Sequence, residues 1–361
     1  MRLEWVNRIK GLSIVLVIFY HSVITFYPFI SDLSKVGEVI VLFWTKLNFL
    51  ISPFRMPVFF FVSGYLVYKY VNFISIRESF DKRVLSIFYV LVIWLMIQTL
   101  SIGYFNRLLN HPVEHISTSN VVYASDYIGF LKSLLVANTS LWYLYALIVY
   151  FIVFRWLKSY KKTTIVIASF VSIFLDYIHT VSWGVDSILR NSIFFAIGCY
   201  YGPSLIDIIK SYNIKNNKLN ILFLSLLSVM LLLLKFKFFP ALFSIFIIVR
   251  VFMALDDVEG NIFLDYLSKV GGNTLAIYVS HRVILEFFSL ATLFFIFNNY
   301  FNGNSLLILL IIYPIVATVL GVYFGNFLKK ISVTAMGDIL FKKPRFLSFS
   351  FKRNEADNLY K

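Results

Sequence analysis

RIKGLSIVLVIFYHSVITFY, residues Arg8 to Tyr27, is a hydrophobic run long enough to cross a bilayer, which takes about 20 residues. The run begins with the basic residues Arg8 and Lys10 and carries His21 well inside its second half. An imidazole within hydrocarbon must find a polar partner or contact water. A helix that only anchors a protein has no use for such a residue, so His21 is a candidate functional residue.

The composition is that of a protein with many membrane spans. Of the 361 residues, 60% are hydrophobic, 19% aromatic and 14% charged, whereas soluble domains carry about 25% charged residues. An open sheet cannot pair all its backbone groups in hydrocarbon, so the expected fold is an all-α, polytopic membrane helix bundle. The single cysteine, Cys199, excludes an intramolecular disulfide. The first run is too long for a cleavable signal peptide and ends without a small-residue cleavage site.

Apolar length predicts about ten transmembrane helices, separated by polar breaks or by breaks marked with Pro or Gly. Residues 1–335 are expected to form one membrane domain and residues 336–361 a basic cytoplasmic tail. The external connection at 106–140 is too short for a second domain. The predicted spans are 9–27, 47–68, 84–105, 139–157, 163–178, 187–202, 219–235, 238–255, 270–297 and 305–328.

The basic residues predict the orientation. With the N-terminus in the cytoplasm, 24 of the 33 Lys and Arg residues lie on the cytoplasmic side, six lie outside, and Arg55, Arg190 and Arg282 fall inside the spans. This bias places both termini in the cytoplasm. The net charge of +15 is therefore mostly a topology signal, with the basic tail placed to contact anionic lipid. No folded basic face is expected, so nucleic acid is not an expected partner.

Lys10 and His21 lie on nearly the same face of the first span, because eleven residues advance about 20° beyond three full turns. Arg55 lies between Pro53 and Pro57, which cannot both continue an ordinary helix, so a broken turn should aim Arg55 inward. The alternative for Lys10 and His21 is an interfacial lysine and a core histidine bonded to a backbone carbonyl.

His281 and Arg282 are expected near the centre of the ninth span. Arg282 and Glu286 are spaced i,i+4 and can neutralise each other, which is the structural alternative for this pair. His281 and Arg282, together with His21 and Arg55, indicate a wet, cationic chamber within the membrane. Arg190, near the outer start of the sixth span, could equally snorkel to the interface.

Polar residues outside the spans give weaker signals. His111 and His115 are spaced as metal ligands on a helix would be, but Pro112 and the scarcity of nearby carboxylates favour loop histidines without a ligand. No metal site is therefore predicted. A second external cluster is more typical of interfacial anchoring than of a binding site, and consists of Asp176, His179, Trp183 and Asp186.

A cationic chamber suits an anionic donor and a hydroxyl acceptor. Acyl transfer from a thioester to a sugar hydroxyl needs a general base, for which a histidine with an ordinary pKa of about 6.5 is suited. The reaction also needs donors for the oxyanion and cations for the phosphates of the donor. The sequence lacks the G-x-S-x-G elbow, the zinc ligand set and the Walker loop, which disfavours hydrolase, metalloprotease and ATPase functions.

Several motifs together resemble acyltransferase family 3, a group of bacterial inner-membrane proteins that O-acylate surface and periplasmic glycans. The order and spacing of these motifs carry the resemblance, because each is weak alone. They are a basic residue eleven before a histidine (Lys10 to His21), RMPVFFFVSGYL (Arg55 to Leu66), the basic pair Lys82-Arg83, LWYLYAL (Leu141 to Leu147), FFAIG (Phe194 to Gly198) and NTLAIYVSH (Asn273 to His281).

The resemblance implies ten core helices in the inner membrane, a cytoplasmic acyl-CoA donor such as acetyl-CoA as co-substrate, no bound cofactor, and a glycan or lipid-linked saccharide acceptor met on the outer face. It implies that His21 is the essential histidine and that Lys10, Lys82 and Arg83 bind the donor. We further expect Arg55, His281 and Arg282 to be candidates for contacting substrate or the oxyanion. The expected process is O-acetylation in polysaccharide modification.

Three positions depart from the family pattern, among them Asn7, where the family often has an acidic residue. The family usually has arginine where this chain has Lys10, and a further arginine where it has Ser86. Lysine keeps the charge but not the bidentate fork that suits phosphate. The alternative function is a membrane transporter or exporter of a glycan precursor or organic anion, and a third is an assembly protein without activity.

Overall fold

The computed structural model describes residues 4–31, 33–108, 128, 131–132, 135–178, 180, 182–256, 260–335, 337–344 and 347. Across these residues the regular structure is helical and contains no strand, which confirms the predicted all-α class. His111, His115, His179 and most of the predicted tail lie outside the described residues.

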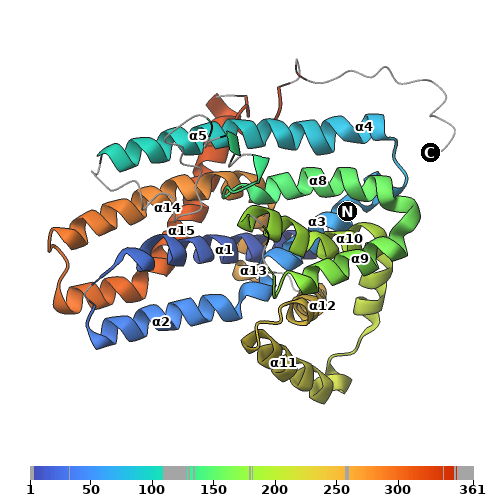
Figure 1. The fold of residues 1–361 in the computed structure, drawn as a ribbon, viewed down its shortest axis with the longest axis horizontal. Coiled ribbons are helices and arrows are strands. Elements are labelled where there is room, and N and C mark those ends of the chain that lie inside the picture. Colours follow the sequence, from blue (N-terminus) through green and yellow to red (C-terminus); the bar gives the residue numbers. More distant parts are fainter. Residues whose placement is uncertain are drawn as a thin grey trace.

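Most of the helices run along the long axis of the molecule (Figure 1). A π-helical turn, Asp81–Leu85, joins α4 to α5. The helices are α1 (Glu4–Phe26), α2 (Lys35–Leu50), α3 (Met56–Asn72), α4 (Ile76–Phe80), α5 (Ser86–Leu108), α8 (Trp142–Trp156), α9 (Lys161–Phe174), α10 (Trp183–Ser211), α11 (Lys218–Leu233), α12 (Phe238–Ala254), α13 (Ile262–Gly272), α14 (Thr274–Phe297) and α15 (Gly303–Ala335).

Among the described residues, five helical segments are long and apolar enough to cross a membrane, or six if the bent pair α2 and α3 forms one span. The predicted count of ten is therefore not confirmed. All ten predicted stretches fall on helices, but some are short: α9, with 14 residues, is about 21 Å long at ~1.5 Å per residue, against roughly 30 Å of hydrocarbon.

The predicted second span, 47–68, has the wrong start. Helix α2 already begins at Lys35, and the charged residues Lys35, Glu38 and Lys46 interrupt its apolar pattern and hide it from a hydropathy argument. The break predicted at Pro53 and Pro57 is present: α2 ends at Leu50, a 3₁₀ turn spans Ser52–Phe54, and α3 leaves at 48° to α2.

Glycine allows two pairs of helices to pack closely. A Cβ added at Gly64 of α3 would lie 2.2 Å from the carbonyl oxygen of Phe195, and one at Gly198 of α10 would lie 2.2 Å from that of Phe61. Gly11 of α1 and Gly271 of α13 approach each other's helices in the same way. Small residues at these contacts let helix backbones approach in a membrane, where van der Waals packing drives association.

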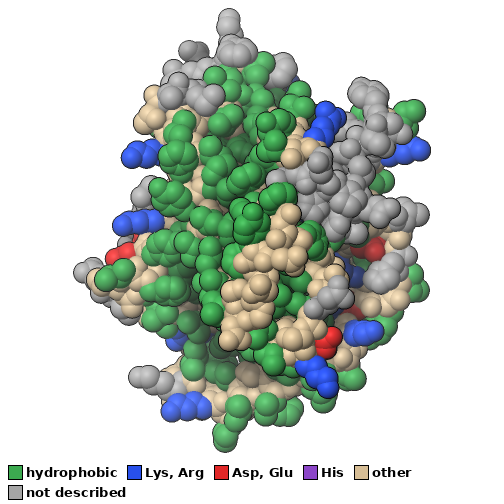
Figure 2. Space-filling model, turned by 90° about the vertical axis from the view of Figure 1, so that its left-hand side faces the viewer, with side chains coloured by type: hydrophobic (Ala, Val, Ile, Leu, Met, Phe, Trp, Pro, Cys, Tyr) green, Lys and Arg blue, Asp and Glu red, His purple; other side chains and the backbone are tan. Residues whose placement is uncertain are grey.

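Large apolar side chains also remain on the outside of the bundle, including Phe43 on α2, Leu100 on α5, Phe170 on α9 and Val319 on α15. Hydrophobic side chains spread over the face shown in Figure 2, with Lys and Arg scattered towards its margins. A surface of this kind is covered by lipid rather than water, and the chain is a multi-pass membrane protein.

Candidate active site

His21 lines a cavity of about 200 Å³, which we call the His21 cavity. It forms where α1 nears its C-terminal end and where α8 and α10 begin. We call this end of the bundle the outer end, because the basic residues predict that it faces away from the cytoplasm. The lining residues are Val17, Tyr20, His21, Arg55, Met56, Ser140, Trp142, Trp183, Ser187, Asn191 and Tyr278.

His21 is paired with His281, which comes from α14, 260 residues later in the chain. His281 Nε2 lies 3.2 Å from His21 Nδ1, and the ring centroids are 5.0 Å apart. His281 Nδ1 lies 2.5 Å from the carbonyl oxygen of Tyr278, and His21 Nδ1 lies 3.0 Å from that of Val17. A carbonyl can only accept, so each Nδ1 carries a proton when the rings are neutral.

This arrangement fixes the tautomers of both rings. With a proton on its Nδ1, neutral His281 has a lone pair on Nε2, which accepts from the Nδ1–H of His21. The same proton on His21 Nδ1 leaves Nε2 of His21 as the basic nitrogen. His21 lines the cavity, whereas His281 is fully buried behind it. The pair therefore leaves Nε2 as the basic nitrogen of the ring that lines the cavity.

A hydrogen-bonded chain holds α14 in register beside His281. The Tyr278 hydroxyl donates to the carbonyl oxygen of Ser140 at 2.7 Å, and Ser140 Oγ donates to Gln98 Oε1 at 2.8 Å. Gln98 Nε2 then donates to the carbonyl oxygen of Val279 at 2.9 Å. These hydrogen bonds join α14 to α5 and to the start of α8. They therefore position the carbonyl of Tyr278, to which His281 donates.

Arg55 reaches the cavity because the helix breaks at this residue. Its guanidinium lies 4.4 Å from the centroid of the Tyr20 ring and donates to Asn48 Oδ1. The broken turn thus aims a cation at the wall beside His21, as the two prolines predict. Of the residues proposed for the oxyanion, Arg55 is the one that lines the His21 cavity within the described chain.

Arg282 has a different position. Its side chain is fully buried and forms an ion pair with Glu286 one turn later, so the i,i+4 alternative considered from the sequence is realised. The described lining of the His21 cavity includes neither Arg282 nor His281. Their placement suits a supporting role behind the histidine pair rather than contact with substrate.

Lys10 lines a second, larger cavity of about 810 Å³ at the opposite end of α1, which we call the inner cavity. Asn7 on α1, Leu66 on α3, and Ser268 and Lys269 on α13 also line it. Lys10 and Lys269 provide two cations, and Glu4 and Asp265 provide two carboxylates. Lys10 is about 16 Å from His21 along the helix axis, at ~1.5 Å per residue.

The structure does not bring the other two predicted donor-binding residues into this cavity. Lys82 is exposed on the π-helical turn, and the Arg83 guanidinium lies 4.0 Å from the centroid of the Tyr70 ring. Tyr70 is one helical turn beyond Leu66, which does line the cavity. Neither Lys82 nor Arg83 is among the described residues that line the inner cavity.

A family model described as an acyltransferase domain matches residues 3–326. The chain belongs to acyltransferase family 3. It is also 35% identical to Inner membrane protein YcfT of Escherichia coli (strain K12) over 341 residues, which cover 94% of this chain and 96% of that protein. No solved structure matches the chain.

The motifs that resemble acyltransferase family 3 lie at structurally distinct places. RMPVFFFVSGYL contains the helix break at Arg55 and the close contact at Gly64, and FFAIG supplies the partner glycine, Gly198. NTLAIYVSH runs from the start of α14 to His281. Ser86, which departs from the family pattern, donates its hydroxyl to the carbonyl oxygen of Asp81 at 2.9 Å in the π-helical turn.

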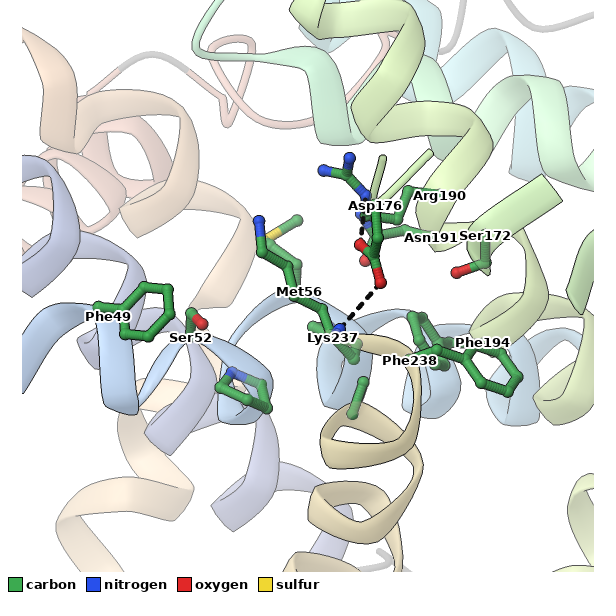
Figure 3. Close-up of a pocket in the computed structure, with 13 residues that line it drawn as sticks. Phe49, Ser52, Met56, Ser172, Asp176, Arg190, Asn191, Phe194, Lys237 and Phe238 are labelled. Carbon is green, nitrogen blue, oxygen red and sulfur yellow. Dashed lines mark hydrogen bonds and ion pairs between the residues drawn. The ribbon is translucent and has the colours of Figure 1, made fainter. Parts of the chain in front are cut away.

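The structure has a third cavity, also of about 200 Å³. This cavity shares the lining residues Met56 and Asn191 with the His21 cavity. We call it the charged cavity. Figure 3 shows Asp176 between Arg190 and the backbone nitrogen of Lys237. Arg190 Nε lies 3.4 Å from Asp176 Oδ1, and the backbone N–H of Lys237 donates to Asp176 Oδ2 at 2.8 Å.

Sequence reasoning missed this second outer cavity. The sequence favours interfacial anchoring for Asp176 and Trp183, but Asp176 lines the charged cavity and Trp183 lines the His21 cavity. Arg190 pairs with Asp176 and its side chain is 21% exposed, so it does not snorkel freely. The sequence signal for this cavity was the presence of Asp176 and Arg190 on either side of the loop that joins α9 to α10. No comparable sequence signal indicated Asn191 or Lys237.

Proposed function

We propose that the protein is a membrane acyltransferase that moves an acyl group, acetyl in the simplest case, from acyl-CoA on the cytoplasmic side to a hydroxyl of a glycan or lipid-linked saccharide on the outer side. The observation that carries the proposal is the His21–His281 pair, which presents an oriented imidazole to a cavity beside Arg55. The printed name of the E. coli relative supports placement in the bacterial inner membrane.

The inner cavity is suited to the donor. Its size suits CoA, and Lys10 and Lys269, which face the two carboxylates Glu4 and Asp265 in the same cavity, offer cations to the phosphates; the extended pantetheine arm would carry the thioester along α1 towards His21. Lys10 and His21 lie on nearly the same face of that helix, and the proposal requires the pantetheine arm to pass along this face, where Ser13 and Ile14 are buried in the structure.

In the proposed reaction, His21 Nε2 takes the proton of the acceptor hydroxyl as its oxygen attacks the thioester carbonyl carbon. Arg55 stabilises the negative charge that develops on the carbonyl oxygen. The C–S bond then breaks, the acyl group stays on the acceptor oxygen as an ester, and the CoA sulfur takes the proton from His21. His281 accepts from His21 Nδ1–H throughout and stabilises the imidazolium form.

The test uses purified protein in lipid nanodiscs with radiolabelled acetyl-CoA, and measures free CoA and labelled acceptor. His21→Ala should lower turnover by about 10²- to 10⁴-fold, the range for loss of a general base. His21→Asn should lower turnover comparably, because its amide retains a donor near Val17 but has no basic nitrogen.

Abundance and melting temperature of both variants serve as controls. Turnover retained by folded His21→Ala would remove His21 from the mechanism. Absence of donor turnover in wild-type protein, combined with uptake of a labelled organic anion into proteoliposomes, would favour the transporter alternative.

A further inference from the structure

The charged cavity contains more positive than negative charge. Arg190 and Lys237 contribute two cations and Asp176 one carboxylate, and Arg55 adjoins the shared wall at Met56. In the described part of the chain, neither the Lys237 ammonium nor the Arg55 guanidinium forms an ion pair with a carboxylate. Unpaired charge of one sign is costly in a partly buried site and favours a ligand of the opposite sign.

The single carboxylate of this cavity is already engaged. The Asp176 side chain is fully buried, lies 3.4 Å from Arg190 and accepts from the Lys237 backbone at 2.8 Å. Asp176 therefore holds the α9–α10 loop against the start of α12. Burial lowers the pKa of the Lys237 ammonium. The positive charges of Arg190 and Arg55 lower this pKa further, whereas the negative charge of Asp176 raises it.

The charged cavity adjoins the His21 cavity directly. Met56 and Asn191 line both, so a ligand in one can extend past these side chains into the other. Both cavities lie at the outer end of the bundle, where α9 ends and α10 and α12 begin. The Asn191 side-chain amide donates to the carbonyl oxygen of Ser187 at 2.8 Å, which turns its own oxygen towards other partners.

We propose that the acceptor carries an anionic group, a carboxylate or a phosphate, which binds in the charged cavity between Arg190 and Lys237 while the accepting hydroxyl reaches His21. This inference rests on the proposed function, because only acyl transfer makes the bound ligand an acceptor. It narrows the substrate class from glycans in general to acidic saccharides, either uronic acids or sugar phosphates.

Binding of small sugars to the nanodisc-embedded protein tests the proposal, with calorimetry as the measurement and glucuronic acid, glucose 1-phosphate and glucose as the probes at equal ionic strength. At least one anionic sugar should bind about tenfold more tightly than glucose, as one or more charge-assisted hydrogen bonds allow. Preference for glucuronic acid would indicate a carboxylate, and preference for glucose 1-phosphate a phosphate. Equal binding of all three sugars, or binding of none, would overturn the proposal.

Lys237→Gln is the informative variant, because the bond to Asp176 comes from the backbone and survives the change of side chain. It should weaken binding of the preferred anionic sugar at least severalfold, with glucose unaffected. Lys235→Gln is the matched control: it removes the same charge two residues away, where the side chain is exposed, and should leave binding unchanged. Undiminished binding by Lys237→Gln would contradict the proposal.

Arg190→Gln is less suitable, since it would leave Asp176 buried without its cation and could unfold the loop. The same measurement in His21→Ala separates the two proposals. Preference for an anionic sugar retained in His21→Ala supports the acidic subsite whether or not the wild type turns over acetyl-CoA. Turnover of acetyl-CoA without any preference for an anionic sugar would contradict the acidic subsite but would be consistent with the acyltransferase proposal.

Discussion

At the scale of the residue, the hydrogen bonds of one ring nitrogen define what His21 can do. His21 Nδ1–H is shared between the carbonyl oxygen of Val17 at 3.0 Å and Nε2 of His281 at 3.2 Å, and these two contacts together leave the basic lone pair on Nε2. The two rings are 260 residues apart in the sequence, so their pairing is a property of the folded bundle. His281 is a positioning residue, because it lies behind His21 and does not line the cavity.

His281→Leu should lower kcat about 10- to 100-fold, the range for losing the partner that orients a functional histidine. KM for acetyl-CoA should stay constant, because the proposed donor site lies at the other end of α1. His281→Gln should recover much of the activity, since its amide oxygen can accept from His21 Nδ1–H. Equal losses in the two variants, measured by steady-state kinetics in nanodiscs, would show that the ring matters only for packing.

The sequence predicts the same donor-binding role for Lys10 and Lys82, but in the structure Lys10 lines the inner cavity and Lys82 does not. Lys10→Ala should raise KM for acetyl-CoA about tenfold, as expected for one charge-assisted hydrogen bond, with little change in kcat. Lys10→Arg should keep or improve affinity, because a guanidinium can bind phosphate with two bonds. Lys82→Ala should change KM less, since Lys82 is exposed outside the described cavity walls; an equal rise would extend the donor site to the π-helical turn.

At the scale of the element, the contact between α3 and α10 holds both cavity walls in place. Gly64→Ala and Gly198→Ala would each place a Cβ 2.2 Å from a backbone oxygen of the facing helix, so the helices must separate. Each variant should lower the free energy of unfolding by about 1–3 kcal/mol, the usual cost of overpacking. Gly103→Ala on α5 is the control, because its Cβ meets nothing within 4 Å and alanine favours a helix.

A thermal unfolding series in one detergent would measure these differences. Gly103→Ala should melt at or above the wild-type temperature and the other two variants below it. Matching melting temperatures for all three would mean that the close approach of α3 and α10 is not a source of stability.

The elements also show how far sequence reasoning reaches. Helix α1 was predictable because its apolar run is long, and the break at Arg55 because two prolines bracket it. The start of α2 was not, because Lys35, Glu38 and Lys46 lower its hydropathy although the helix still forms. The charged cavity depends on residues from α9, α10 and α12 that meet only after packing, and local patterns carry no information about such meetings.

At the scale of the whole molecule, two cavities lie at opposite ends of α1, one lined by Lys10 and the other by His21. Such a separation suits a reaction whose donor and acceptor come from different sides of a membrane. The proposed function therefore requires the inner cavity to face the cytoplasm and the His21 cavity to face outward, as the bias of basic residues predicts.

Cysteine labelling can establish these orientations, since the chain has one cysteine, Cys199, which is buried. In a Cys199→Ser background, a membrane-impermeant maleimide added to intact spheroplasts should label Asn302→Cys, in the exposed loop between α14 and α15, and Ser187→Cys in the His21 cavity. Lys269→Cys, in the inner cavity, should react only after the membrane is permeabilised. Labelling of Lys269→Cys in intact spheroplasts would reverse the orientation and place the proposed donor site on the side where acyl-CoA is absent.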